Sequence, residues 1–326
     1  MPATDMDFLF RLIEPLQSWL FQSLILPALY ALGLMEYADD AYDATGFFVL
    51  GTAEIALAYV LLRPLEAWRP VEQWADRRAV RVDALYTFLY RSGLLPLFFY
   101  LLLFPLLNPL EIHLRLAGYL PPNLEELIPW LQQSPFVAFL VYAAAIDFSE
   151  YWSHRLQHRF SWWWALHSVH HSQRQLSFWA DDRNHVFDGL LQSVWLVTVA
   201  HLIGVPGNQF VLVVLLMGLV ESLSHANVRL CFGTVGGRLL VSPCYHRIHH
   251  GIGVGHEGKA QGCNFATLFP VWDWLFGTAN FARIYPPSGI RDQLEGVDYG
   301  EGFVAQQVKA LARLGRVLAR AARRPA

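Results

Sequence analysis

Long apolar segments separated by polar loops dominate the first half of the chain. Charge-free or nearly charge-free runs cover residues 16–35, 46–62, 84–107 and 135–152. A helix of about 20 apolar residues is long enough to cross the hydrocarbon core of a bilayer. The pattern therefore predicts four membrane-spanning helices, the first of them kinked at Pro27.

Two shorter apolar segments, residues 189–203 and 208–223, are joined by a tight turn. Each is short for a complete span. Whether they cross the bilayer or only enter it, the turn returns the chain to the side on which it started.

Charge in the connecting loops predicts the orientation. The loop at residues 36–45 has four acidic residues and no basic one, whereas residues 63–83 contain five arginines. Because basic loops are retained on the cytoplasmic side, we expect the second loop inside and the first outside. Two further spans then place the chain after residue 152 at the cytoplasmic face.

Composition supports a membrane protein of the all-α class. The chain is 54% hydrophobic and only 16% charged, against about 25% charged in typical soluble domains. Its three cysteines, Cys231, Cys244 and Cys263, are widely spaced, and we expect them to be reduced thiols.

The last segment, residues 303–326, contains six basic residues and no acidic one. Val308, Leu311, Leu314 and Leu318 recur in it with the period of a helix. This pattern is typical of a basic amphipathic helix, which either lies on an anionic leaflet or is solvated.

Nine of the thirteen histidines form four clusters, all of them after residue 150. They are His154 and His158; His167, His170 and His171; His225; and His246, His249 and His250. Histidines spaced by three or four residues share one face of a helix, so two rings can reach one metal ion. Neutral imidazole binds zinc, copper, iron and nickel. The clusters therefore predict a metal site.

Nine imidazoles exceed the coordination of a single ion, so two ions with four or five ligands each fit the set better. The H-E-x-x-H motif of zinc hydrolases is absent, because neither five-residue histidine pair contains its glutamate. A nearly all-histidine set with open positions favours redox-active iron over structural zinc.

The order of these motifs resembles the fatty acid hydroxylase / sterol desaturase superfamily of membrane di-iron oxygenases. The matching elements are H-x3-H, H-x2-H-H, a single histidine near Asn227, and a second H-x2-H-H. Asn264-Phe265 and the segment Trp272–Thr278 resemble the closing motifs of the family, although Ala266 replaces the usual glycine. The resemblance covers residues 135–280.

The resemblance implies a bundle of four or more spans with a cytosolic, histidine-rich cap. In that cap, two non-haem irons would use molecular oxygen to hydroxylate or desaturate an alkyl position of a lipid. The lipid would enter from the bilayer, and electrons would come from an external donor such as a reductase or ferredoxin. The membrane would be the bacterial inner membrane, or the endoplasmic reticulum in a eukaryote.

We divide the chain into N-terminal spans at 1–134, the histidine region at 135–280 and the tail at 281–326, within one integrated domain. One alternative is a histidine-rich metal or haem carrier, and another is a membrane metallohydrolase. Sterol, fatty acyl, ether lipid and carotenoid substrates all remain open.

Several polar residues are predicted to support the histidines by accepting their second N–H group or by taking part in ligation. They are Asp147, Glu150, Glu221, Asn264, Asp273 and His185. Asp147 and Glu150 lie on the helical face of His154, and Glu221 lies one turn before His225. Carboxylates in apolar segments are costly and are retained mostly for function. The competing interpretation is capping or a local ion pair for the five residues other than His185, and an ordinary loop histidine for His185.

Other residues fit structural roles. We expect His201 to be buried or interfacial, His113 and His256 to face solvent, and Trp162, Trp163 and Trp164 to form an interfacial aromatic belt.

Overall fold

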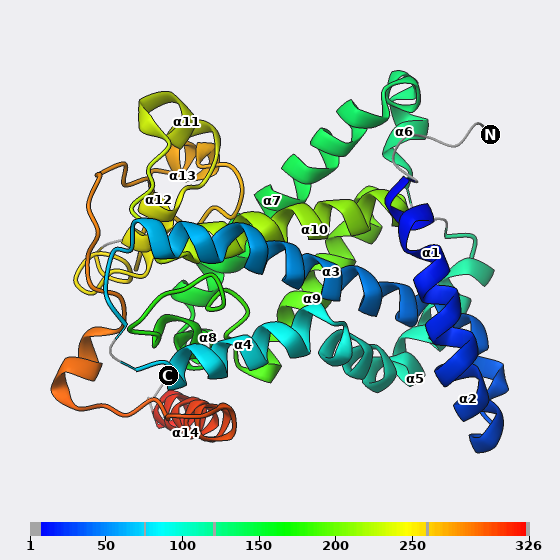
Figure 1. The fold of residues 1–326 in the computed structure, drawn as a ribbon, viewed down its shortest axis with the longest axis horizontal. Helices are drawn as coiled ribbons and strands as arrows, with labels where there is room; N and C mark the ends of the chain where they lie inside the picture. The colour runs from blue at the N-terminus through cyan, green and yellow to red at the C-terminus, as the bar shows by residue number, and fades with distance from the viewer. Residues whose placement is uncertain (1–7, 75, 120–121, 259–260, 324–326) are drawn as a thin grey trace. The chain divides into compact units, whose positions relative to one another are not determined.

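The computed structural model describes residues 8–74, 76–119, 122–258 and 261–323. Within these residues the protein is helical and forms no β-strand; a single isolated bridge joins Gly251 and Ser288. This confirms the predicted all-α class (Figure 1).

Apart from the C-terminal helix, five helices among the described residues have 18 or more residues. They are α3 (Ala38–Trp68), α5 (Leu94–Leu116), α7 (Pro135–Arg159), α9 (Val186–Ile203) and α10 (Gly207–His225). The remaining helices are α1 (Phe8–Leu20), α2 (Leu26–Leu32), α4 (Arg78–Arg91), α6 (Leu124–Leu127), α8 (Ser161–His171), α11 (Gly233–Leu239), α12 (Pro243–His249), α13 (Val271–Leu275) and α14 (Phe303–Ala322).

Four helices among the described residues are long and apolar enough to cross a membrane. They cover residues 35–68, 94–116, 186–203 and 207–225. The segments whose length the sequence left in doubt therefore form α9 and α10, both of sufficient length.

The first predicted span is interrupted, and the third begins later than predicted. Residues 16–35 are divided among α1, a π-helical turn at Phe21–Ile25 and α2. Pro27 follows this turn and has no N–H group to continue the α-helical pattern, which explains the interruption. The span predicted to begin at residue 84 begins at Leu94, because Gly93 has a φ of 79° and separates α4 from α5. Helix α7, which covers the fourth predicted span, is long enough to cross a membrane. Its polar residues make it less apolar than the four candidate spans named above.

The chain divides into two compact units. One contains residues 1–57, 88–142 and 201–215, and the other contains residues 58–87, 143–200 and 216–326. All four histidine clusters belong to the second unit. The domain boundaries predicted at residues 134 and 280 stay predictions.

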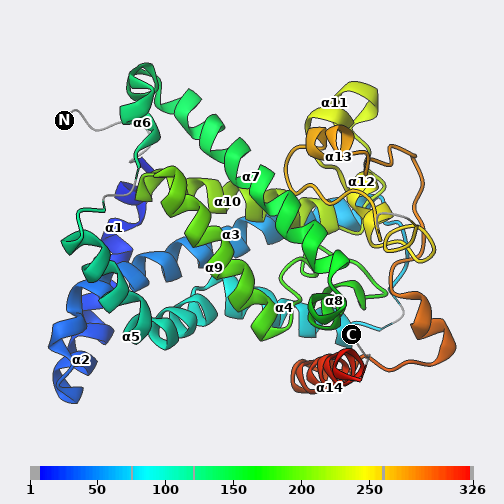
Figure 2. The same ribbon diagram turned by 180° about the vertical axis from the view of Figure 1, so that it is seen from behind.

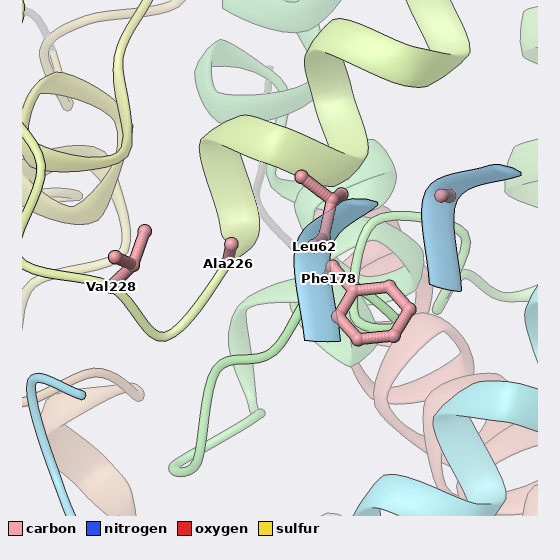
Figure 3. Packing of buried hydrophobic residues seen from close by; sticks show 5 residues of the cluster. Leu62, Phe178, Ala226 and Val228 are labelled. Atoms are coloured by element: carbon pink, nitrogen blue, oxygen red, sulfur yellow. The ribbon is translucent and has the colours of Figure 1, made fainter. Parts of the chain in front are cut away.

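An apolar cluster in the second unit fixes the end of α10, which carries His225. Leu62 of α3 packs with Phe178, Ala226 and Val228 (Figure 3). Beside this cluster, Oε1 of Glu66 accepts the backbone N–H groups of Phe178 and Asn227, both at 3.0 Å. The last turn of α3 thus joins the loop after α8 to the loop after α10.

A buried ion pair fixes the loop after α8. Nη1 of Arg183 lies 2.8 Å from Oδ1 of Asp83 in α4, and Gln173 also donates to that carboxylate. Helix α14 packs against α8 (Figure 2). The ion pair therefore joins the loop after α8 to α4, and α14 packs on α8 itself.

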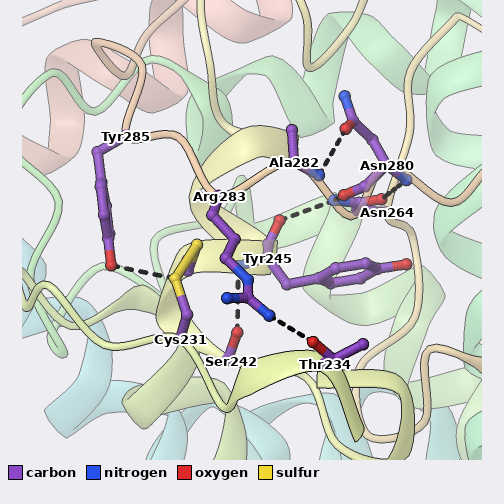
Figure 4. Close-up of a disulfide and its surroundings, with 10 residues drawn as sticks. Cys231, Thr234, Ser242, Tyr245, Asn264, Asn280, Ala282, Arg283 and Tyr285 are labelled. Atoms are coloured by element: carbon purple, nitrogen blue, oxygen red, sulfur yellow. Dashed lines mark hydrogen bonds between the residues drawn. A yellow bond between two sulfur atoms is a disulfide. The ribbon is translucent and has the colours of Figure 1, made fainter. Parts of the chain in front are cut away.

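The expectation of three reduced thiols is wrong for two of them. Cys231 and Cys244 form a disulfide with a Cα–Cα distance of 5.1 Å, and Cys263 is free (Figure 4). The pairing depends on the loop after α10 returning to the first turn of α12, where Cys231 and Cys244 become neighbours. Sequence spacing does not reveal such a return.

Candidate metal centre

Four helices deliver the clustered histidines to one place. His154 and His158 lie one turn apart on α7, and the last turn of α8 carries His167, His170 and His171. His225 ends α10, and α12 supplies His246, His249 and His250 around its end. His154 is partly buried, and the other eight are buried.

The structure gathers eight of these residues into two groups of four. The first group is His154, His158, His171 and His249, and the second is His170, His225, His246 and His250. Within each group, one ring nitrogen from every histidine lies within 4.8 Å of the other three. Each group therefore forms a convergent set of four nitrogen donors.

The nitrogen separations match those of atoms that share one metal ion. Nε2 of His225 lies 3.0 Å from Nε2 of His246, 3.1 Å from that of His250 and 3.3 Å from that of His170. Two nitrogens bound at about 2.1 Å to one ion are about 3.0 Å apart when the ligands meet at right angles. In the first group, Nε2 atoms of His158 and His171 are 3.1 Å apart.

The two groups adjoin because neighbouring histidines are divided between them. His170 belongs to the second group and His171 to the first, and the same division separates His250 from His249. Successive residues on a helix point about 100° apart, so a histidine doublet can serve two centres. The rings of His171 and His250 are 4.5 Å apart between their centroids.

Burial keeps the imidazoles in the neutral form that binds metals. Burial, followed by repulsion from His167, lowers the pKa of His154 to about 3. Burial also lowers the pKa values of other members of both groups far below the usual range; these are His158, His170, His171, His246, His249 and His250. Their lone pairs are therefore available at neutral pH.

One loop orients three of the four histidines of the first group. The carbonyl oxygens of Gln261, Cys263 and Phe265 lie 3.2, 2.7 and 2.8 Å from Nδ1 of His158, His249 and His154, respectively. A carbonyl can only accept, so Nδ1 carries the proton in each ring and Nε2 is left free to bind. The Nε2 atoms of His154 and His249 are buried without a hydrogen-bond partner among the described residues, as expected of metal ligands.

Asp147, Asn264 and Asp273 act on this loop. Asp273 accepts the N–H groups of Phe265 and Ala266 at 2.9 and 2.8 Å. Asp147 accepts the N–H of Leu268 at 2.7 Å, the N–H of Phe269 at 2.9 Å and the indole N–H of Trp272 in α13 at 2.8 Å.

Asn264 completes the loop in a left-handed conformation, with a φ of 58°. Its amide donates to the carbonyls of Tyr245 and Asn280 (Figure 4). Among the described residues, the side-chain hydrogen bonds of Asp147, Asn264 and Asp273 therefore go to the loop, to α12 and α13 and to the residues after α13, and not to a histidine ring. They support the rings through the backbone of residues 261–269.

His167 lies between the two groups and is oriented by Asp188. Its Nδ1 is 3.0 Å from Oδ2 of Asp188, whereas its Nε2 is buried and has no hydrogen-bond partner in the described part of the chain. Its ring centroid is 5.2 Å from those of both His154 and His170. Asp188 was not predicted from the sequence. The available signal was a carboxylate at the start of an apolar segment, three residues after His185.

Other predicted supporting residues lie differently from expectation. The backbone carbonyl oxygen of Glu221 lies 2.8 Å from Nδ1 of His225. Glu150 is in α7, and its Oε1 is buried without a hydrogen bond. His185 is outside both groups, and its Nδ1 accepts the N–H of Phe187 at 3.1 Å.

The sequence suggested that His256 faces solvent, but the structure shows that it does not. Its ring lies 4.6 Å from that of His171, and its Nε2 is 2.9 Å from the carbonyl of Gly289. His113 is exposed, in agreement with expectation, and His201 is exposed rather than buried.

The three tryptophans do not form one belt. Trp163 is buried and donates to Asp188 at 2.7 Å, and the ring of Trp164 lies 4.9 Å from that of His158. Of the three tryptophans, Trp162 is exposed, with 38% of its surface accessible. Two of them are therefore part of the support of the site.

A polar cavity of about 610 Å³ reaches the first group. His158, Trp164 and His256 line it together with charged residues, namely Arg159, Glu257, Arg291, Asp292 and Glu295. A cavity with this lining suits water, ions or a polar partner surface better than a lipid tail.

Comparison with known proteins places this region in a family. Residues 139–278 match the model of the fatty acid hydroxylase family. Alkylglycerol monooxygenase of Homo sapiens is 26% identical over 154 residues, which is 46% of this chain and 32% of that protein. Alkylglycerol monooxygenase of Danio rerio is 27% identical over 151 residues, with the same two shares.

Delta(7)-sterol-C5(6)-desaturase of Nicotiana tabacum is 27% identical over 158 residues, which is 46% of this chain and 52% of that protein. The matched region thus spans about a third of the alkylglycerol monooxygenases and about half of the desaturase. No solved structure matches the chain significantly. All nine clustered histidines lie between residues 139 and 278, within the part of the chain that matches the fatty acid hydroxylase family.

Proposed function

We propose that this protein is a membrane-bound, oxygen-dependent oxidoreductase that oxidises an alkyl C–H position of a lipid with two non-haem irons. The observation that carries the proposal is the pair of adjoining four-nitrogen groups, in which seven of the eight histidines are buried. One group would hold each iron. His167, between the groups and with a free Nε2, would be the ninth ligand.

The bound irons would supply the oxidising power that an inert C–H bond requires. The residues of the chain have separate tasks. The carbonyls of residues 261, 263 and 265 fix the tautomers of three histidines, and Asp188 fixes that of His167. Burial excludes water from the ring nitrogens, and donors other than histidine are absent from both groups in the described part of the chain.

The names of the relatives include a monooxygenase and a desaturase. Hydroxylation and desaturation share the removal of hydrogen from a C–H bond, so we propose this common step for a lipid that enters from the bilayer. An external donor would provide electrons, and the polar cavity beside His158 is where we expect it to approach.

Lipid oxidation can be tested with purified protein in detergent or lipid discs. We expect two irons per chain, and oxygen consumption with a chemical reductant and a lipid extract from the host membrane. Mass spectrometry of the lipids should reveal the gain of one oxygen or the loss of two hydrogens. Labile metal or haem without oxygen consumption would instead identify a carrier, and zinc with hydrolysis would identify a metallohydrolase.

We also propose that the histidine groups face the cytoplasm. Gln73 and Glu295 are exposed in the second unit, and Asp40 lies in the acidic segment of the first. In intact cells, cysteines at Gln73 and Glu295 should be protected from an impermeant thiol reagent, and one at Asp40 should react. The parent protein provides the background from Cys263. Reaction at Glu295 but not at Asp40 would reverse the orientation.

A further inference from the structure

Helix α14 contacts the rest of the second unit through polar and small residues. Gln306 and Ala310 are 2% and 0% exposed. Oε1 of Gln306 accepts the hydroxyl of Tyr86 at 2.9 Å, and the guanidinium of Arg313 lies 4.2 Å from the ring centroid of Tyr299. These contacts fix which side of α14 faces the protein.

The apolar stripe of α14 points away from these contacts. Val304, Val308, Leu311 and Leu318 are 70%, 59%, 42% and 53% exposed. Their spacing of four, three and seven residues places them on one face of the helix. A surface helix normally buries such a stripe against its own protein. Here the stripe is left without a partner within the described part of the chain.

The basic residues of α14 lie on the side of the helix away from the exposed stripe. Arg316 and Arg320 are exposed, and no acidic residue occurs anywhere in residues 303–326. Lys309 is paired with Asp298. A helix with an exposed apolar face and a basic face opposite it is typical of helices that lie in the headgroup region of an anionic leaflet, with the apolar face among the lipid tails.

The direction of α14 also suits a membrane surface. In both ribbon views α14 is strongly foreshortened, whereas the end of α3 after residue 57, in the same unit, runs across the picture (Figures 1 and 2). Helix α3 is one of the four candidate spans. A helix that lies crosswise to a span lies along the plane of the bilayer.

We propose that α14 docks on the anionic leaflet of the membrane, with Val304, Val308, Leu311 and Leu318 among the acyl chains and Arg316 and Arg320 at the phosphates. This surface is separate from the histidine groups, so the proposal does not depend on the metal chemistry. It would fix the second unit at the bilayer surface, where a lipid-oxidising site has to work.

Spin-label depth measurements on the full chain can test this docking. The protein would be placed in lipid discs of phosphatidylcholine with 30% phosphatidylglycerol, with one introduced cysteine at Val304, Val308 or Leu311. We expect labels at these positions to be relaxed by oxygen and shielded from a water-soluble nickel complex. The matched control is Ala305, which is exposed but lies about 100° around the helix from Val304. Its label should be several-fold more accessible to nickel.

A second comparison tests the charge. Changing Arg316 and Arg320 to glutamine should reduce the docked fraction about fivefold for each arginine in anionic discs, and less in pure phosphatidylcholine. Nickel access at Leu311 equal to that at Ala305, which lies about 120° from Leu311 around the helix, would show a solvated helix and overturn the proposal. Shielding of Val308 from both oxygen and nickel would show that protein covers the stripe, and would overturn it as well.

Discussion

Asp188→Asn should disable one metal ligand without removing any histidine. Oδ1 of Asp188 accepts from Gln157 at 2.9 Å and Trp163 at 2.7 Å, and Oδ2 faces Nδ1 of His167 at 3.0 Å. An asparagine that keeps the first two bonds turns its NH₂ group toward His167. Two donors would then face each other, unless His167 moves its proton to Nε2. A protonated Nε2 cannot bind a metal.

The expected magnitude follows from the burial of the carboxylate. Asp188 is 0% exposed, so water cannot replace the lost bond. An unsatisfied buried donor costs about 1–3 kcal/mol. Loss of a group that orients a ligand histidine typically weakens metal binding by about 10- to 100-fold. We therefore expect iron to be lost at chelator concentrations that leave the parent protein loaded.

The assay is iron content against chelator concentration, together with the melting temperature of the metal-free protein. Asp83→Asn is the matched control, because Asp83 is equally buried but bonds Arg183 and Gln173 rather than a histidine. It should lower the melting temperature and leave the iron affinity of the folded protein unchanged. In a His167→Ala background, Asp188→Asn should weaken iron binding little further. If Asp188→Asn retained iron like the parent, the orientation of His167 by Asp188 would be refuted.

The remaining predictions concern the ligands, their supporting loop and pH. His170→Ala should reduce iron below two per chain and abolish lipid oxidation, whereas the exposed His113→Ala should stay active; parental activity with full iron in the first variant would refute the di-iron assignment. Asp147→Asn should weaken the loop that holds His154, so iron binding should fall by less than for a lost ligand, as measured by chelator titration; an effect as large as that of His170→Ala would contradict an indirect role. The folded-state pKa of His154 is about 3, below its usual 6.5. Its contribution to the stability of the metal-free protein is therefore complete above pH 6.5 and is lost as pH falls toward 3, by up to about 1.4 kcal/mol per pH unit. Chemical denaturation between pH 7.5 and 5 measures this loss, and a flat profile would count against a neutral, buried His154.

The sequence by itself determined the features that depend on local spacing. Apolar length predicted a helical membrane protein, because a span needs a minimum number of residues regardless of its neighbours. The spacing of His154 and His158, and of the two H-x2-H-H motifs, predicted rings on shared helical faces. The period of Val308, Leu311 and Leu318 predicted an amphipathic helix over the tail, and α14 forms there.

Tertiary structure decided everything that depends on contacts between distant segments. His170 and His171 belong to different histidine groups. Which group each one joins depends on how the last turn of α8 is oriented relative to α7, α10 and α12. The support of His167 by Asp188 joins two helices, and the disulfide of Cys231 with Cys244 joins a loop to a helix start. The periodicity of α14 does not predict which face packs against the protein, because the hydrogen bond between Gln306 and the Tyr86 hydroxyl forms only in the folded protein. Spacing along one helix is fixed by the backbone, whereas these pairings depend on how several helices pack against one another.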